Sequence, residues 1–182
     1  MPVEWSPCDV PGLLRSTPVS SADDRGTFTK ALAGELPGQP PVIPDEVFWS
    51  RSHRGVLRGL HLQSPPREGR KVVFVTSGVV RDFVVDLRVG SPWFGVVWEM
   101  TLDDAAGALV VPAGCAHGFE SLTDDVTMVY LQEGSYDPTS DIGVLWSSVG
   151  IELEATLPIV SARDSALPAL EDFVSPFTWD SS

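Results

Sequence analysis

Short runs of apolar residues, separated by turn-forming residues, dominate the pattern of this chain. Residues 71–75 (KVVFV) form a β-branched and aromatic run that closes on Thr76, Ser77 and Gly78, a pattern typical of a hairpin. Residues 82–88 alternate strictly, with Phe83, Val85 and Leu87 on one side and Asp82, Val84, Asp86 and Arg88 on the other. We therefore expect this strand to pack one face in a core and to carry a carboxylate-rich stripe on the other.

Further strands are expected at 94–100, 108–111 and 126–132. The segment 33–45 is rich in proline and glycine and predicts a loop, and only 165–172 suggests a short helical turn near the C-terminus. Several short strands with turn residues between them favour an antiparallel sandwich or barrel. The length of 182 residues is typical of one domain, so we expect a single domain over 1–182.

Composition and charge narrow the possible partners and compartments. The formal net charge of −13 argues against nucleic acid, because such proteins usually present a basic face to phosphates. The longest mostly apolar stretch, 105–116, is too short for a bilayer span and is broken by proline and glycine. Two cysteines, Cys8 and Cys115, suit a reducing compartment, and the N-terminus shows no signal-peptide pattern. We expect a cytoplasmic protein without membrane association.

Two of the three histidines, His61 and His117, stand among glycines, which suggests backbone turns that aim an ionisable group. The plainer alternative is that each is a hydrogen-bonded wall residue. Six of the twelve basic residues lie between positions 51 and 71. They form either a site for an anionic group or a solvated basic loop paired with carboxylates. The six are Arg51, Arg54, Arg58, Arg67, Arg70 and Lys71.

Several common site types find no support in the sequence. A metal site would have to combine His61, His117 and Glu68 from distant segments, and no H-x-H pair occurs, so we expect no metal. The chain contains no G-x-S-x-G nucleophile motif, no G-x-G-x-x-G fingerprint and no P-loop.

A longer series of motifs resembles the dTDP-4-dehydrorhamnose 3,5-epimerase family. The motifs stand in the family's order across about residues 23 to 170: 24–28 (DRGTF), 55–63 (GVLRGLHLQ), 71–73, 82–88, 90–92, 94–95, 112–114 and 116–119 (AHGF). The resemblance implies an all-β fold, a cupin-type antiparallel β-barrel (jelly roll) with short peripheral helices. It also implies a homodimer that acts on a small-molecule nucleotide sugar without cofactor or metal.

The resemblance implies a reaction as well. It is the epimerisation at C3, C5 or both of a dTDP-linked 4-keto-6-deoxyhexose through an enolate, in deoxysugar or natural-product biosynthesis. Removing a proton beside a ketone needs a positioned base and a group that stabilises the enolate. By resemblance, His61 is the base, Asp164 its paired carboxylate, Lys71 the cation at the C4 oxygen, and Tyr130 the acid on the opposite face. The substrate-binding positions implied are Arg25, Phe28, Glu46, Arg58, Gln63, Asp82 and His117.

The chain departs from the family pattern at positions that recognise the ligand. Glu46 and Phe48 stand where the family usually has Gln and Asn, Lys30 replaces a Glu, Trp93 replaces a Thr, and 146–149 (WSSV) replaces W-N-D-P. This pattern favours an altered substrate. One alternative is a repurposed cupin isomerase or cyclase acting on a non-nucleotide ketone in secondary metabolism, and another is a cupin that only binds a sugar.

Overall fold

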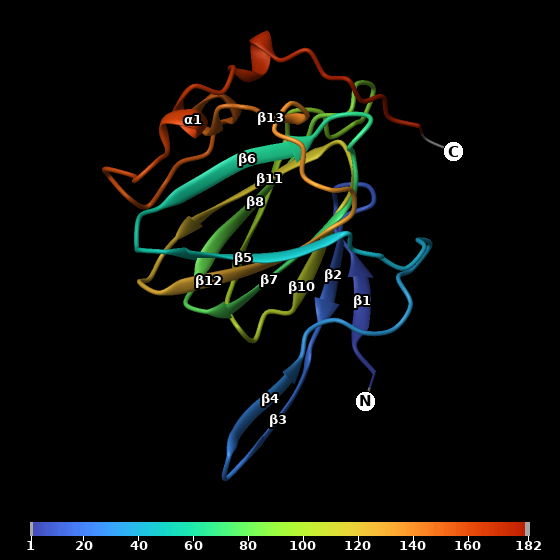
Figure 1. Cartoon of the computed structure of the whole chain (residues 1–182), viewed down its shortest axis with the longest axis vertical. Coiled ribbons are helices and arrows are strands. Elements are labelled where there is room, and N and C mark those ends of the chain that lie inside the picture. Colours follow the sequence, from blue (N-terminus) through green and yellow to red (C-terminus); the bar gives the residue numbers. More distant parts are fainter. Residues whose placement is uncertain (1, 181–182) are drawn as a thin grey trace.

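Two antiparallel sheets face each other in the computed structural model, which describes residues 2–180 (Figure 1). The larger sheet has the order β1 (Glu4–Pro7), β2 (Leu14–Thr17), β10 (Ala108–Val111), β7 (Lys71–Ser77), β12 (Val126–Gln132) and β5 (Glu46–Ser52). The smaller has the order β13 (Asp141–Gly143), β6 (Leu57–Gln63), β11 (Cys115–Ser121), β8 (Val80–Asp86) and β9 (Val97–Leu102). The predicted all-β jelly roll is confirmed.

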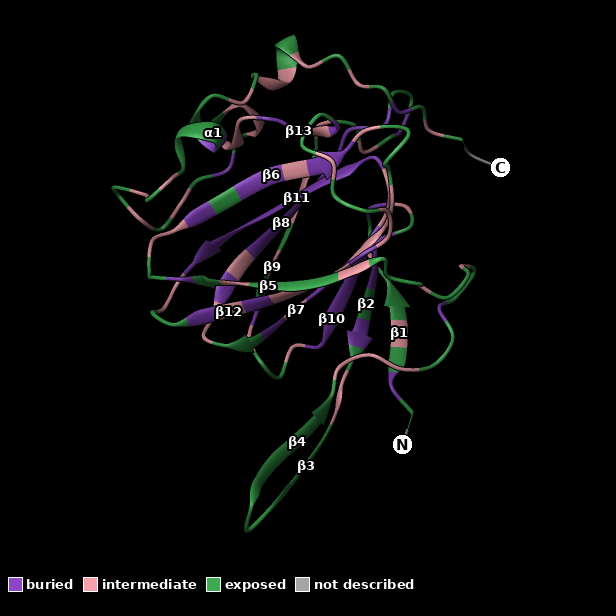
Figure 2. Ribbon diagram, viewed as in Figure 1, coloured by how far each residue is buried: buried purple, intermediate pink, exposed green. Residues whose placement is uncertain are grey.

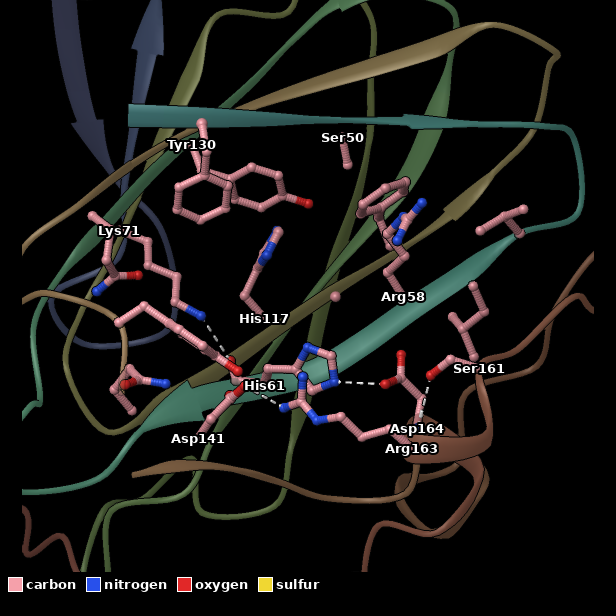
Figure 3. A pocket seen from close by; sticks show the side chains of 18 of the residues that line it. Ser50, Arg58, His61, Lys71, His117, Tyr130, Asp141, Ser161, Arg163 and Asp164 are labelled. Carbon is pink, nitrogen blue, oxygen red and sulfur yellow. Dashed lines mark hydrogen bonds and ion pairs between the residues drawn. The ribbon is translucent and has the colours of Figure 1, made fainter. Parts of the chain in front are cut away.

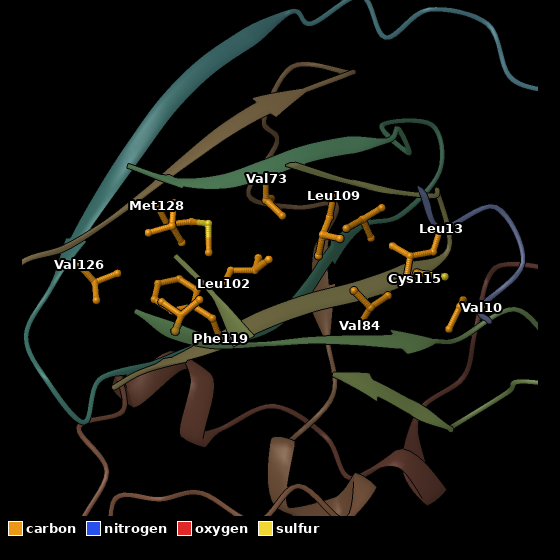
Figure 4. Packing of buried hydrophobic residues seen from close by; sticks show 13 residues of the cluster. Val10, Leu13, Val73, Val84, Leu102, Leu109, Cys115, Phe119, Val126 and Met128 are labelled. Carbon is orange, nitrogen blue, oxygen red and sulfur yellow. The ribbon is translucent and has the colours of Figure 1, made fainter. Parts of the chain in front are cut away.

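The main core fills the space between the two sheets (Figure 4). The larger sheet contributes Val73, Leu109 and Met128, and the smaller sheet contributes Val84 and Phe119, all of them buried. Apolar side chains at every second position of facing strands meet here, as expected for a two-layer β fold. Burial of this apolar surface is the main stabilising contribution to such a fold.

The outer face of the smaller sheet is also covered, which explains why both sides of 82–88 are buried. Phe83, Val85 and Leu87 pack outward against the C-terminal segments, where Ile151 and Phe177 are among the covering residues. The opposite side of β8 faces the interior between the sheets, so its carboxylates Asp82 and Asp86 are fully buried. The predicted carboxylate-rich stripe of β8 is therefore present, and it is buried inside the barrel (Figure 2).

The predicted hairpin at Gly78 is wrong. Strand β7 belongs to the larger sheet and β8 to the smaller one, so the chain crosses between the sheets at this turn. After the turn, the N–H of Val79 donates to the Thr123 hydroxyl and its carbonyl accepts from Leu122. The apolar runs on either side of the turn fit both arrangements, so the sequence pattern could not distinguish a hairpin from a crossover.

The other predicted elements lie close to their expected positions, whereas β1 to β6, β11 and β13 were not predicted as strands. The strands at 108–111 and 126–132 lie where predicted, whereas the strand expected at 94–100 runs from 97 to 102. Residues 33–45 form a loop, and Leu36 and Val42 from it pack on the outer face of the larger sheet. In place of the single helical turn expected at 165–172, the structure has two short helices, α1 (Ala162–Ser165) and η2 (Leu170–Asp172). A third short helix, η1 (Trp146–Val149), precedes them. No helix in residues 2–180 is long and apolar enough to cross a membrane.

A separate hairpin projects away from the two sheets (Figure 1). It consists of β3 (Val19–Asp23) and β4 (Gly26–Lys30), and nine of its ten strand residues are exposed. Its two strands pair only with each other. The sheets of the same chain therefore give this hairpin little support.

Candidate active site

A cavity of about 820 Å³ opens between the two sheets. This volume is typical of a pocket for a ligand of drug or nucleotide size. One wall comes from β5, β7 and β12 of the larger sheet, and the other from β6 and β11 of the smaller sheet (Figure 3). Eight of the predicted site residues line this cavity: Glu46, Arg58, His61, Gln63, Lys71, His117 and Tyr130 from the strands, together with Asp164 from α1.

A bulge in β6 explains why both Arg58 and His61 enter this cavity. Residues three apart on a regular strand point to opposite faces. In the pairing of β6 with β11, however, His61 stands opposite His117 and Arg58 opposite Phe119, so that two residues of β6 face one of β11. Gly59 has φ +106°, and a side chain there would start 2.6 Å from the carbonyl oxygen of His117. Glycine therefore permits the bulge that turns both side chains inward.

His61 is held by a carboxylate. Its Nε2 lies 2.9 Å from Oδ1 of Asp164, which is 6% exposed, and the other oxygen of Asp164 accepts the Gly59 N–H at 3.0 Å. Burial alone would raise the pKa of Asp164, but the hydrogen bonds from His61 and Gly59 outweigh it and lower that pKa to about 2. An ionised carboxylate can only accept, so Nε2 of His61 carries the proton. The other nitrogen, Nδ1, lies on the side of the ring toward His117 and Tyr130 (Figure 3).

Lys71 reaches from β7 across to the other sheet. Its Nζ donates to the backbone carbonyl of His61 at 3.1 Å, which places the ammonium group beside the histidine. Burial lowers the pKa of Lys71 to about 8, although the negative charge of Asp141 acts in the opposite direction. The lysine therefore remains mostly protonated at neutral pH and brings a positive charge to a partly desolvated site.

Tyr130 enters the cavity from β12, on the wall opposite β6. Its ring stacks on Phe48 of β5, with centroids 4.9 Å apart and an angle of 14° between the planes. The ring of His117 meets it edge-on at 6.1 Å and 78°. Burial raises the pKa of the phenol above its ordinary value, and the nearby Ser50 hydroxyl acts in the opposite direction. The phenol thus stays protonated and able to donate at neutral pH.

The other predicted polar residues support these walls. His117 is fixed by Asp82, whose Oδ2 lies 2.8 Å from its Nε2, and both side chains are buried. Asp82 is fully buried behind His117 and does not itself line the cavity. Gln63 lines the wall and accepts the N–H of Asp137 at 3.0 Å. Arg58 donates to the Ser52 hydroxyl at 3.0 Å.

Two predicted binding residues lie elsewhere. Arg25 and Phe28 belong to the projecting β3–β4 hairpin, where Phe28 is 64% exposed and Arg25 pairs with Asp23. Neither is among the residues that line the cavity of the same chain. The hairpin would need a neighbouring molecule to bring them to a ligand.

The basic cluster predicted between positions 51 and 71 is split by the fold. Only Arg58 and Lys71 of its six members line the cavity. Arg70 forms a salt bridge with Glu133 at 2.6 Å, and Arg51 and Arg54 are exposed outside it. The positively charged side chains of the cavity are therefore Arg58, Lys71 and Arg163.

Only some of the departures from the family pattern concern the cavity. Glu46 and Phe48 both line it, and Glu46 accepts the backbone N–H of Tyr136 at 2.9 Å. Lys30 is exposed on the projecting hairpin. Trp93 packs at the margin of the main core, and Trp146 packs on the outer face of the smaller sheet. The replacements that would alter ligand contacts within this chain are therefore those on β5.

No group of three or more His, Cys, Asp or Glu side chains in residues 2–180 is arranged to hold a metal ion. His61 and His117 are each paired with a different carboxylate, and Glu68 is exposed outside the cavity. The polar groups of the cavity are instead arranged for proton transfer and for binding of a polar ligand.

The structure adds cavity residues that the sequence analysis did not identify. Asp141 on β13 lies 2.5 Å from Nη2 of Arg163, and both line the cavity with Tyr136. Arg163 directly precedes Asp164 in the sequence, and this position beside a predicted site residue was the only indication of its place in the cavity. Gln132 and Ser50 lie two positions from Tyr130 and Phe48, so strand alternation was the signal that could have placed them on the same face.

Comparison with known proteins agrees with these features. A family model described as dTDP-4-dehydrorhamnose 3,5-epimerase matches residues 7–172. A dTDP-4-dehydrorhamnose 3,5-epimerase of Streptomyces griseus is 37% identical over 182 residues, covering 91% of this chain and 86% of that protein. A dTDP-4-dehydrorhamnose 3-epimerase of Streptomyces niveus is 38% identical over 166 residues, covering 87% and 79%.

Solved structures give the same result. NovW, a 4-keto-6-deoxy sugar epimerase from the novobiocin biosynthetic gene cluster of Streptomyces spheroides, is similar with a TM-score of 0.88. The two chains are 33% identical, and the similarity covers 93% of this chain and 88% of NovW. The paired histidine, the half-buried lysine and the opposed tyrosine thus belong to a chain whose fold and sequence match one family. The chain belongs to the dTDP-4-dehydrorhamnose 3,5-epimerase family, and it is an isomerase of the dTDP-sugar epimerase class.

Proposed function

We propose that this protein inverts the configuration at C3, C5 or both of a dTDP-linked 4-keto-6-deoxyhexose in deoxysugar biosynthesis. The observation that carries the proposal is one cavity with a carboxylate-paired histidine on one wall and a tyrosine on the other. Inversion requires that a proton leave one face of a carbon and return to the other. A base and an acid on opposed walls meet that requirement.

His61 acts as the base in this proposal. Because Asp164 holds a proton on Nε2, the lone pair of Nδ1 is free to take the proton from the carbon beside the ketone. The carbon–hydrogen bond breaks and its electron pair moves to the C4 oxygen, which gives an enolate. The negative charge of Asp164 stabilises the imidazolium that forms.

Lys71 and Tyr130 complete the reaction. The ammonium group of Lys71 lies beside His61 and stabilises the enolate oxygen in a partly buried site. Tyr130 then gives its phenolic proton to the opposite face of the carbon. His61 releases its proton to solvent and the phenolate regains one, so that the enzyme returns to its starting state without a cofactor.

The test is exchange with solvent. Incubation with a dTDP-4-keto-6-deoxyhexose in deuterated water should place deuterium at C3, C5 or both, detected by NMR. The variant His61→Asn keeps the approximate size of the side chain but lacks the base, and it should incorporate less than about one hundredth of the wild-type amount. Deuterium no higher than in a heat-inactivated control would refute the proposal.

A second candidate is a related isomerisation or cyclisation of a ketone that carries no nucleotide. Glu46 and Phe48 support it, since they place a carboxylate and an apolar ring where the family usually has amides. Binding of dTDP separates the two candidates. At a dTDP concentration one hundred times its Kd, native-state binding adds about 2.7 kcal/mol of stability and raises Tm by several degrees. No change in Tm at millimolar dTDP would favour the second candidate.

We further propose that the protein works as a homodimer in which each β3–β4 hairpin reaches the cavity of the other copy. Support comes from the hairpin's exposure and from the implied role of Arg25 and Phe28 in substrate binding. Mixed dimers of His61→Asn and Arg25→Ala chains would contain one intact site. After exchange of subunits, activity should return to about a quarter of the wild-type value, because half of the dimers are mixed. No recovery would refute the shared site.

A further inference from the structure

Phe48 contacts the tyrosine to which we assign proton return, and it does so from the adjacent strand. The register of β5 and β12 places Phe48 directly opposite Tyr130. Their rings are close to parallel, with centroids 4.9 Å apart. Such directly opposed aromatic pairs stabilise one another beyond the area that they bury.

Tyr130 has a second aromatic neighbour on the far wall. His117 of β11 meets the ring edge-on at 6.1 Å, and Asp82 holds His117 at 2.8 Å. The phenol is thus bounded by Phe48 on its face and by His117 from the facing sheet. Rotation of Tyr130 about its side-chain bonds would break the stacked contact with Phe48.

We propose that Phe48 is a positioning residue that holds Tyr130 in the orientation that protonates the face opposite His61. This inference rests on the proposed function and adds a determinant of its stereochemical outcome. Phe48 stands where the family usually has an amide, which could not stack in this way. The contact is therefore a feature of this chain and not of the family pattern.

The consequence concerns the fate of the enolate. If Tyr130 donates, the carbon is inverted. If His61 returns a proton that it has exchanged with solvent, the carbon regains its original configuration and carries solvent hydrogen. Loss of the stacked ring leaves proton removal by His61 intact but reduces donation by Tyr130. Exchange without inversion should then increase relative to inversion.

The experiment compares deuterium incorporation with inversion at the same carbon in deuterated water. Phe48→Leu retains apolar volume without a ring face, and Phe48→Asn restores the amide typical of the family. Phe48→Tyr retains the ring and serves as the conservative variant. Val47→Asn, on the outward face of the same strand and 60% exposed, is the matched control for an amide on β5.

We expect the ratio of exchange to inversion to rise about tenfold in Phe48→Leu and Phe48→Asn, the change that loss of one aromatic pair would cause. KM should stay within about threefold of wild type, since the charged and hydrogen-bonding groups of the cavity remain. Phe48→Tyr and Val47→Asn should retain the wild-type ratio.

The outcomes separate this inference from the proposed function. An unchanged ratio in a folded Phe48→Leu protein would overturn the inference, and so would an increase in KM alone, which would make Phe48 a substrate contact. If Phe48→Asn fails to fold, Phe48→Leu and Phe48→Tyr still decide the matter. Absence of both exchange and inversion in the wild-type protein would instead refute the proposed function.

Discussion

Replacement of Asp164 by asparagine is the most direct perturbation of the candidate base. The change keeps the size of the side chain and an acceptor for the Gly59 N–H, but it removes the negative charge 2.9 Å from Nε2 of His61. An asparagine can also present its NH₂ group to His61, which would favour the tautomer with the proton on Nδ1. Nδ1 would then no longer offer a lone pair to the substrate.

The structure gives the size of the electrostatic contribution of Asp164 to catalysis. Despite burial, the pKa of Asp164 lies at about 2 instead of 3.8, which corresponds to about 2 kcal/mol in favour of the ionised carboxylate. Loss of this amount from the transition state that carries the imidazolium lowers the rate about 30-fold. Loss of the correct tautomer adds to this, and in a comparable catalytic triad it costs several powers of ten. We expect kcat of D164N to fall by between about 30-fold and about 10,000-fold.

The assay is kcat for epimerisation, with Asp104→Asn as an exposed aspartate of the same chain outside the cavity. A folded D164N protein with kcat within threefold of wild type would refute the pairing argument. Stability offers a second measurement. Because the folded pKa is lowered, the stabilisation is complete above about pH 4 and is lost as the pH falls toward 2. D164N should therefore lose less stability than wild type over that range.

Three further predictions concern other parts of the structure. Because the pKa of Lys71 is about 8, kcat should fall above that pH as the ammonium loses its charge. Lys71→Arg should lower kcat but should also remove this decrease at high pH, since arginine stays charged. The same decrease in the Lys71→Arg variant would refute the assignment. Asp86→Asn should lower the free energy of unfolding, measured in urea, by about 3 kcal/mol, because it leaves buried Arg88 without the carboxylate 2.6 Å away. A decrease of less than about 1 kcal/mol would contradict this. Gly143→Ala should lower Tm by several degrees, because its Cβ would lie 1.9 Å from the Leu60 carbonyl oxygen; an unchanged Tm would show that β13 moves freely.

The sequence predicted much of the local structure. Short apolar runs predicted β7, β8, β9, β10 and β12 and the loop at 33–45 within a few residues, because strand alternation depends on neighbouring residues. The other strands, including β6 with His61, were not predicted. The motifs around Arg58, His61 and Lys71 predicted the family, which the comparisons confirm. The roles assigned to His61, Lys71, Tyr130 and Asp164 remain predictions, although all four side chains line one cavity.

The sequence pattern did not predict which distant segments pair with one another. The hairpin expected at Gly78 is a crossover between sheets, and the faces of β8 are both buried because C-terminal residues cover one of them. The basic residues between 51 and 71, which are neighbours in the sequence, separate onto different surfaces in the fold. Local periodicity contains no information on which remote strand or segment covers a given face.

By itself, the sequence determined which residue types were available for acid–base chemistry and which short segments would be extended. Only the tertiary structure decided which of them meet. A two-residue bulge at Gly59 turns Arg58 and His61 to the same side, whereas regular alternation would separate them. Asp164 reaches His61 across 103 positions of the chain, and Phe48 reaches Tyr130 through strand register. These contacts depend on packing of the whole barrel, since no local interaction brings such distant residues together.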